Sequence, residues 1–272
     1  MSKLYPPQVN TSKLEIHLWW FTALLIAINV GLFAWQVLHG MDISNPSTID
    51  AIRWGADYAP LSFLAEPARL FTSMFFHFGL IHLMLNMWAL YIFGSIAEQM
   101  LGRVYFIGLY FLAGISGSLL SGYVSIQDSY ELLRIGEANR ALLPSVGAGA
   151  SGAVMGIGAA LTILSLFPVL PQQRFLLDKR TLVSVMAINL VMGFMISGIN
   201  NAAHIGGMLM GAFLAATWYF GQKIQRGAVV NLASLLLGLA ICWFIYQYCL
   251  SLVVYVTPLW QELIQWMPNT TS

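Results

Sequence analysis

The stretch GASGAVMGIGAALTILSLF, residues 149–167, begins with a serine between glycines and continues as an apolar segment. A second stretch, AHIGGMLMGAF, residues 203–213, carries a histidine at the start of another apolar segment. Ionisable residues inside a bilayer are rare and mark candidate functional sites. A serine needs a nearby base to become a nucleophile. Ser151 and His204 therefore predict a hydrolytic site within a membrane-embedded helix bundle.

The composition indicates that the whole chain is a membrane protein. Of its 272 residues, 58% are hydrophobic and only 8% are charged, whereas a soluble domain has about 25% charged residues. A helix needs about 20 apolar residues to cross the hydrocarbon core. The stretches that qualify are residues 18–38, 72–93, 104–125, 150–169, 181–198, 201–221 and 228–256. We predict an all-α, polytopic helical bundle.

Basic residues near the ends of the spans predict how the chain threads through the membrane, because Lys and Arg favour cytoplasmic loops. If the N-terminus is cytoplasmic, most of the twelve basic residues face the cytoplasm. These are Lys3, Lys13, Arg103, Arg174, Lys179, Arg180, Lys223 and Arg226. Seven spans then place the C-terminus outside, and spans two, four and six run from outside to inside.

The predicted organisation has four parts. Residues 1–17 form a short cytoplasmic N-terminus, and residues 18–221 form a six-helix core. Residues 222–256 hold a cytoplasmic linker and a seventh transmembrane helix, and residues 257–272 form an external tail. The first apolar segment is long and lacks a small-residue cleavage site, so we expect no cleavable signal. A bacterial cytoplasmic membrane is the expected location.

This threading places four polar residues at a similar depth below the outer surface. His82 and Asn86 lie in the outer half of the second span, Ser151 begins the fourth, and His204 lies near the start of the sixth. The outer parts of the predicted spans contain no Asp or Glu that would orient the histidine. The sequence therefore predicts a Ser-His dyad and not a triad with a carboxylate.

Small residues follow both members of the dyad. Gly152 and Gly156 follow the serine and Gly207 and Gly211 follow the histidine, each pair four residues apart. Such spacing lets two membrane helices approach closely. The glycines are also compatible with helix packing alone, but directly beside Ser151 and His204 the same packing positions the dyad. Residues expected to pack at the site also include Gly149 and Met155.

A tetrahedral intermediate needs hydrogen-bond donors for its oxyanion. Ser151 lies at a helix N-terminus, where backbone N–H groups favour negative charge. His82 and Asn86, four residues apart on one helix, supply candidate side-chain donors. The alternative is that they only join helices through hydrogen bonds, as membrane His and Asn residues often do.

Several motifs, in their order along the chain, resemble those of the rhomboid family of intramembrane serine proteases. The resemblance extends from about residue 52 to residue 220. It rests on Trp54-Gly55-Ala56, His77 with His82 and Asn86, the trio Gly94, Glu98 and Gly102, Gly149-Ala150-Ser151-Gly152, and Ala203-His204-Ile205-Gly206-Gly207.

The resemblance implies a six-helix core plus one C-terminal helix, with Ser151 as nucleophile and His204 as general base. It assigns the oxyanion hole to His82, Asn86 and the Ser151 backbone N–H. Its implied substrates are single-span membrane proteins that enter laterally and are cut after a small residue, near the outer part of their transmembrane segment. Three residues are expected to have structural roles. His77 braces the first external loop, Arg69 helps to anchor that loop, and Glu98 is part of a structural cluster at the end of a span.

The chain departs from the family pattern at two positions. Ala68 precedes Arg69 where many relatives have tryptophan, which would weaken anchoring of the first external loop. Met155 stands four residues after the serine, where relatives often have an aromatic that stacks on the histidine. Methionine is a soft apolar side chain that still packs against a ring.

Two other functions compete with proteolysis. The first is a catalytically inactive rhomboid-like protein that binds transmembrane helices, although the presence of both Ser151 and His204 counts against it. The second is a small transporter, although paired repeat halves with broken helices are missing. The histidines lack carboxylate or Cys partners at ligand spacing, so we expect no metal, no other cofactor and no nucleic-acid partner.

Overall fold

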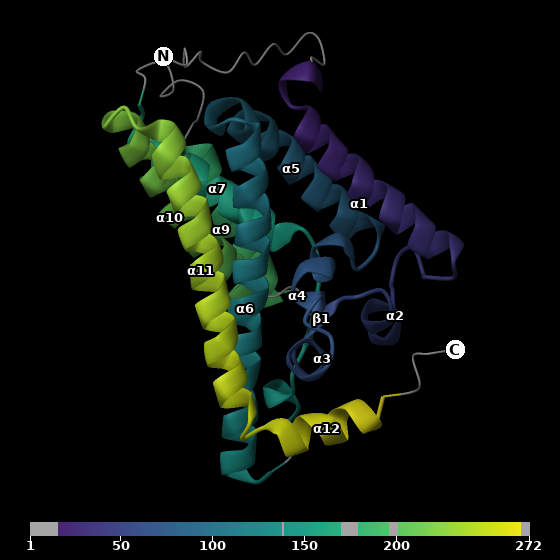
Figure 1. Cartoon of the computed structure of the whole chain (residues 1–272). Coiled ribbons are helices and arrows are strands. Elements are labelled where there is room, and N and C mark those ends of the chain that lie inside the picture. Colours follow the sequence, from purple (N-terminus) through teal and green to yellow (C-terminus); the bar gives the residue numbers. More distant parts are fainter. Residues whose placement is uncertain (1–15, 138, 170–178, 196–200, 268–272) are drawn as a thin grey trace.

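The computed structural model describes residues 16–137, 139–169, 179–195 and 201–267. Within these residues, seven long helices form one bundle (Figure 1). They are α1 (Trp20–Leu38), α5 (Leu80–Leu101), α6 (Arg103–Ile135), α7 (Ser151–Leu166), α9 (Lys179–Met195), α10 (Asn201–Lys223) and α11 (Gly227–Val253). The predicted helical class is therefore confirmed. The predicted N-terminal segment 1–17 lies almost entirely outside the described residues.

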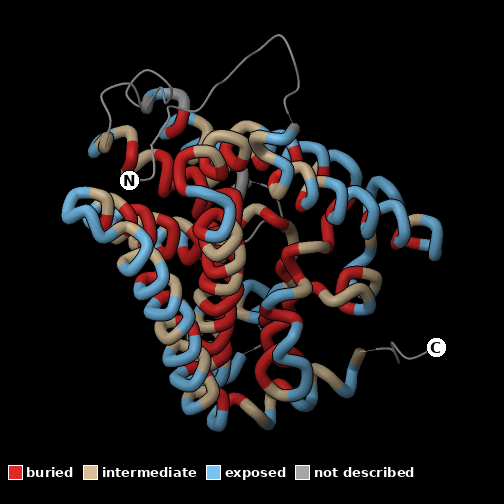
Figure 2. Tube along the Cα trace, turned by 45° about the horizontal axis from the view of Figure 1, so that its top comes forward, coloured by how far each residue is buried: buried red, intermediate tan, exposed pale blue. Residues whose placement is uncertain are grey.

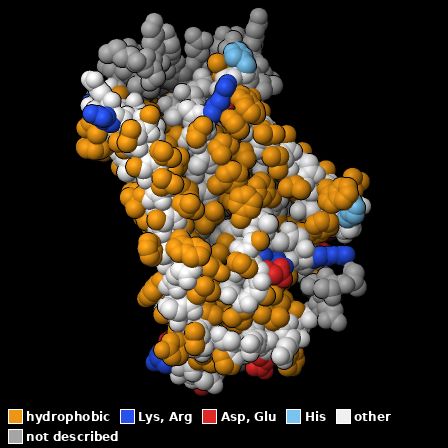
Figure 3. Space-filling model, in the orientation of Figure 1, with side chains coloured by type: hydrophobic (Ala, Val, Ile, Leu, Met, Phe, Trp, Pro, Cys, Tyr) orange, Lys and Arg blue, Asp and Glu red, His pale blue; other side chains and the backbone are white. Residues whose placement is uncertain are grey.

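The described helices have the lengths and composition of a multi-pass membrane protein. By these criteria α1, α5, α6 and α11 are long and apolar enough to cross a membrane, while α7 and the Leu182–Val191 part of α9 are shorter apolar helices. Apolar side chains cover much of the face that Figure 3 shows. Such a surface is expected where lipid, and not water, surrounds the helices.

Helix α7 is short and lies at the centre of the bundle. Every residue from Gly152 to Leu161 is buried, and Figure 2 shows buried backbone concentrated in the middle of the molecule. Helices α5, α6, α9 and α10 pack around it. Its 16 residues rise about 24 Å at about 1.5 Å each. The surrounding helices therefore shield it from lipid.

Glycines allow α7 and α10 to touch backbone to backbone. A Cβ atom added to Gly207 would meet the carbonyl oxygen of Gly152, and one added to Gly211 would meet that of Gly156. Helix α6 joins the same contact, since the Ser116 hydroxyl donates to the Gly206 carbonyl at 3.0 Å. The predicted glycine pairs therefore face each other across the two helices.

The second span begins later than hydropathy predicted, at Leu80 and not near residue 72. Residues Arg69–Thr72 form the short helix α4, and Ser73–Phe75 form a 3-10 turn. Gly79, with φ of +89°, then redirects the chain into α5. Hydropathy did not resolve this break because apolar residues continue through it.

The third span continues ten residues beyond the predicted end at 125. Helix α6 ends at Ile135, with Gly136 as its left-handed cap, and a 3-10 turn follows at Arg140–Leu142. Residues 131–135 therefore belong to α6 and not to the loop that follows it. Packing extends α6, because the Trp260 indole N–H donates to the Ser129 hydroxyl at 2.9 Å.

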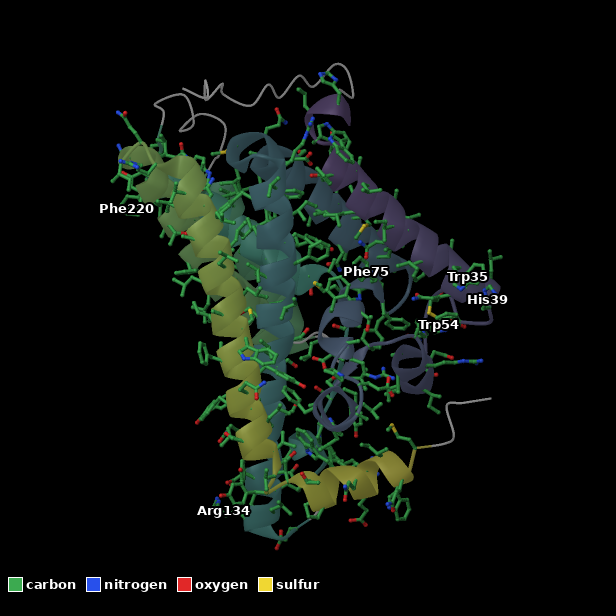
Figure 4. The ribbon with its side chains drawn as sticks, in the orientation of Figure 1. Trp35, His39, Trp54, Phe75, Arg134 and Phe220 are labelled. Atoms are coloured by element: carbon green, nitrogen blue, oxygen red, sulfur yellow. The ribbon has the colours of Figure 1, made fainter. Side chains whose placement is uncertain are left out.

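The last helix of the described residues, α12 (Thr257–Gln265), is amphipathic and lies within the segment predicted as an external tail. Its Trp260 is fully buried and lies 6.4 Å, between ring centroids, from Phe63 of α3 (Ala59–Leu64). Helix α11 is also held to α6, since the Tyr130 hydroxyl donates to the Leu252 carbonyl at 2.8 Å. In Figure 4, Arg134 marks this end of α6, and Phe220 lies at the opposite end of the bundle.

The segment between α1 and α5 is compact and ordered by backbone contacts. It contains α2 (Thr48–Arg53), β1 (Asp57–Tyr58), α3 and α4. Strand β1 pairs antiparallel with β2 (Val146–Gly147), which immediately precedes the glycine-rich turn. Trp35, His39 and Trp54 gather beside this loop at the end of α1 (Figure 4). Tryptophan is favoured at membrane interfaces.

Candidate active site

The turn before Ser151 is held by two side chains and one backbone contact. Gly149 has φ of +114°, and its N–H donates to the Ser73 carbonyl at 2.9 Å. The Ala150 N–H donates to His77 Nε2 at 3.3 Å. A Cβ at Gly149 would lie only 2.8 Å from His82 Cε1. Glycine is therefore required here both by its φ and by the close approach of His82.

His77 holds the turn that leads into Ser151, because it accepts a hydrogen bond from the Ala150 N–H. Its predicted role in bracing the first external loop stays a prediction. The ring is fully buried. Burial, and next the nearby His82, lower the pKa of His77 well below its ordinary value. A neutral ring keeps an acceptor nitrogen for the Ala150 N–H.

Ser151 and His204 meet across the α7–α10 contact. His204 Nε2 lies 2.8 Å from Ser151 Oγ, which is hydrogen-bonding distance. The histidine is 2% exposed, and the serine is partly exposed. Among the described residues, His204 Nδ1 has no hydrogen-bond partner. The pair therefore has the geometry of a dyad whose histidine is held by packing and not by a carboxylate.

His82 and Asn86 lie beside this pair on α5. The Phe78 N–H donates to His82 Nδ1 at 3.2 Å, so in the neutral ring Nε2 carries the proton and is a donor. One N–H of the Asn86 amide donates to the His82 carbonyl at 3.0 Å, and the second N–H is available to a ligand. Both side chains line the same groove as Ser151 and His204.

This groove has a volume of about 1090 Å³ and lies between α5 and α9. Its walls include Leu85 and Trp88 of α5 and Ile188 of α9, and these three are well exposed on the surface of the bundle. One end of the groove is lined by residues of α2 and by Met267, just after α12. An extended peptide entering between α5 and α9 would thus reach the serine without crossing the rest of the bundle.

Met155 is 2% exposed and lines the groove together with His204. It therefore occupies the space beside the dyad in which the family pattern often has an aromatic residue. An apolar side chain at this position limits the freedom of the imidazole by packing alone.

Arg69 and Glu98 hold structure away from the groove. Arg69 Nη1 donates to the carbonyls of Ile52 at 2.6 Å and Ala56 at 3.0 Å, which fixes the segment between α1 and α5. Glu98, 2% exposed, accepts hydrogen bonds from the Phe21 N–H at 3.1 Å and the Thr22 N–H at 2.8 Å. A carboxylate at a helix N-terminus satisfies its free N–H groups, so Glu98 fastens α5 to α1.

A second, smaller cavity lies on the α6 side of Ser151. Its volume is about 30 Å³, and its polar lining residues are Asp57, Ser73, His82, Ser118, Ser121 and Ser151. The sequence motifs described above do not include Asp57. Its proximity to Ser151 arises from the β1–β2 pairing, for which two-residue strands leave no detectable periodic signal. Within the described residues, no three His, Cys, Asp or Glu side chains are grouped as a metal site.

Comparison with known proteins identifies a family. Residues 64–222 match the Rhomboid domain. The chain is 32% identical to Rhomboid protease GluP of Bacillus subtilis over 83% of its own length and 40% of that protein. It is 28% identical to Rhomboid protease AarA of Providencia stuartii over 85% of its own length and 83% of that protein. It is 31% identical to RHOMBOID-like protein 1 of Arabidopsis thaliana over 74% of its own length and 49% of that protein.

Proposed function

Because the chain belongs to the rhomboid family, we propose that it is an intramembrane serine protease with Ser151 as nucleophile and His204 as general base. The observation that carries the proposal is the 2.8 Å contact between Ser151 Oγ and His204 Nε2 inside a helix bundle. Proteases in the same family, GluP and AarA, support the hydrolase class.

The reaction follows the order of acyl transfer. His204 Nε2 accepts the proton of the Ser151 hydroxyl as Oγ attacks the substrate carbonyl. The protonated imidazole then donates this proton to the leaving amine, and an acyl-enzyme ester remains on Ser151. Water attacks the ester, His204 accepts its proton and returns it to Ser151, and the new carboxyl terminus is released.

The oxyanion is stabilised by donors from two helices. The His82 Nε2–H, the free N–H of Asn86 and the backbone N–H of Ser151 supply them. His82 and Asn86 line the groove beside the serine, which supports this role. Donors aimed at the developing charge contribute about 10²–10³ to kcat each.

The substrates are single-span membrane proteins, taken up through the groove between α5 and α9. The exposed apolar side chains of Leu85, Trp88 and Ile188 are compatible with a transmembrane helix arriving from the lipid. Its end nearest the outer face unwinds and is cut after a small residue. The core, residues 18–221, carries the reaction, and residues 222–256 add the linker and seventh helix.

The protein resides in a bacterial cytoplasmic membrane, with its N-terminus in the cytoplasm and its C-terminus outside. The charge distribution described above supports this orientation. The dyad then lies near the outer surface.

The test compares wild type with Ser151→Ala in proteoliposomes that contain a tagged single-span protein. We expect cleavage by wild type only, together with labelling of Ser151 by a fluorophosphonate probe. Ser165→Ala is a matched control, because this serine lies on the same helix and its hydroxyl donates to the Thr162 carbonyl. Equal cleavage by wild type and Ser151→Ala would reject the proposal. So would a wild type that neither cleaves nor becomes labelled, the result expected of an inactive helix-binding relative.

A further inference from the structure

The turn between α10 and α11 exposes two positive charges at one end of the bundle. Helix α10 ends at Lys223 and α11 begins at Gly227, and both Lys223 and Arg226 are exposed. Within the described part of the chain, neither side chain forms an ion pair or a hydrogen bond. The Lys223 ammonium lies over the ring of Tyr219, 5.4 Å from its centroid. Both cations are therefore open to a negatively charged ligand.

The acidic residues of the protein lie away from this turn. Helices α10 and α11 contain no Asp or Glu. Of the acids that the structure describes, Glu98 lies at the same end of the bundle, but it is buried and bonded to Phe21 and Thr22. The others lie between α1 and α5, in or just after the last part of α6, and in α12: Asp42, Asp50, Asp57, Glu66, Asp128, Glu131, Glu137 and Glu262. This end of the bundle therefore attracts anions.

The backbone of the turn is fixed by hydrogen bonds. The Arg226 N–H donates to the Gly221 carbonyl at 3.0 Å, and the Gln225 N–H donates to the Gln222 carbonyl at 3.2 Å. This is the hydrogen-bond pattern of a Schellman motif, whose left-handed position is usually glycine. Gln225 occupies that position with φ of +56°. Its exposed amide, between the two cations in sequence, adds a further donor to the same turn.

Exposed apolar side chains flank the cations on both helices. Phe220 precedes them on α10 and is 58% exposed, and Val229 follows them on α11 and is 66% exposed. In Figure 4, Phe220 lies at the end of the bundle where this turn is found. The two helices approach closely here, since a Cβ at Gly221 would lie 2.8 Å from that of Val230. The surface thus combines a positive turn with an apolar region next to it.

We propose that the α10–α11 turn binds an anionic phospholipid, with the phosphate on Lys223 and Arg226 and the acyl chains along Phe220 and Val229. Near a membrane surface each Lys or Arg favours an anionic lipid about fivefold in affinity. A zwitterionic lipid carries the same phosphate, but its own ammonium group offsets the charge. A free phosphate ion lacks the chains that contact the apolar side chains. The inference is independent of the proposed function, because it involves neither member of the dyad.

The experiment uses the full chain in a neutral detergent at fixed concentration. Phosphatidylglycerol and phosphatidylcholine with identical acyl chains are titrated, and bound lipid is counted by native mass spectrometry beside thermal unfolding. We expect wild type to bind phosphatidylglycerol about 25-fold more tightly and to melt at a higher temperature in its presence, because the lipid binds the folded state. Lys223→Gln and Arg226→Gln should each weaken this binding about fivefold. The double variant should bind the two lipids equally.

Arg134→Gln is the matched control. It removes the same charge from an exposed side chain at the opposite end of the bundle, where Arg134 pairs with Glu131. This variant should keep the full preference for phosphatidylglycerol. Thermal unfolding without added lipid checks that every variant folds like wild type. If the double variant does not fold, the two single variants and the wild-type comparison decide the question.

Three results would overturn the proposal. The first is equal binding of the two lipids by wild type. The second is a preference that persists in the double variant or falls as much in Arg134→Gln, which would indicate attraction to total charge and not a site. The third is displacement of phosphatidylglycerol by millimolar sodium phosphate, which would identify a site for a free anion. None of these results depends on cleavage, so failure here leaves the proposed protease function untouched.

Discussion

The α7–α10 contact and the α11–α12 arm are held together in opposite ways. At the first, glycines remove side chains so that the carbonyls of Gly152 and Gly156 touch the partner helix. At the second, large side chains make the contact, with Trp260 and Tyr130 donating hydrogen bonds to α6 and α11. The dyad lies at the glycine contact, where backbone position and not side-chain adjustment sets the Ser151–His204 distance.

The difference predicts how each region responds to substitution. The glycine contact has no free volume, so added atoms are costly there, because closely packed interiors resist overpacking. The arm loses buried area when a side chain is removed, and the cost follows the size of the cavity that remains.

The largest effect is expected at the glycine contact. Gly207→Val adds atoms where the Gly152 carbonyl lies, and we expect it to abolish cleavage and to destabilise the bundle by about 3 kcal/mol. Gly31→Val is the control, because a Cβ at Gly31 of α1 meets nothing within 4 Å. Thermal unfolding in detergent and cleavage assays measure both variants. Equal tolerance of the two would contradict the close α7–α10 packing.

The next largest effect is expected among the oxyanion donors. Asn86→Ala should lower kcat about 10²-fold with little change in stability. Asn189→Ala is a close control. Asn189 also lines the groove, and its amide also bonds a carbonyl on its own helix, that of Val185. The measurement is kcat for both variants. If Asn86 contributed only to the general polarity of the groove, the two variants would lose similar amounts of activity.

A smaller effect on activity is expected in the arm. Trp260→Ala removes a fully buried side chain and should destabilise the α12–α3 contact by about 3 kcal/mol. Cleavage should fall only a few-fold, because the dyad lies on other helices. Hydrogen exchange of residues 257–265 and 59–64 would report the local opening. Trp266→Ala, which alters a side chain that is 80% exposed, should leave exchange unchanged. A complete loss of activity in Trp260→Ala would show that the arm controls the dyad.

The smallest effect is the pH dependence of stability that Asp57 causes. Asp57 lies between the two regions, near Ser151, and accepts a hydrogen bond from Ser62 of α3, the helix that contacts α12. The pKa of Asp57 is raised from 3.8 to about 7 by burial, so between these values the native state holds a proton that the unfolded state has released. The free energy of unfolding therefore falls as pH rises through this window, and the loss is complete above about pH 7. Asp57→Asn should weaken this pH dependence. Between pH 5 and 8 its melting temperature should fall by roughly 2–4 °C less than that of wild type.

Asp42→Asn controls for this measurement. Asp42 is fully exposed, and hydrogen bonds from the Asn45 and then the Ser44 backbone N–H groups lower its pKa, so it titrates below the window. Its replacement should leave the slope between pH 5 and 8 unchanged. Identical slopes in Asp57→Asn and wild type would mean that Asp57 is ionised throughout this range.

The predicted helix boundaries show which features of the fold follow from local sequence. Hydropathy placed the start of α7 within one residue, because glycine and serine directly precede the apolar run. It placed the start of α5 about eight residues early, because apolar residues continue through α4 and the 3-10 turn. Positive φ at Gly79 marks the true boundary. A glycine in a sequence does not by itself report its φ.

The sequence alone determined the helical membrane class and the candidates Ser151, His204, His82 and Asn86, because hydrophobic length and short motifs are local properties. Only the tertiary structure decided the 2.8 Å Ser151–His204 contact and the facing of Gly152 by Gly207. It alone decided the length of α6, the docking of α12 and the cavity that places Asp57 near Ser151. These features depend on burial between residues distant along the chain, and no local pattern of residue types encodes that burial.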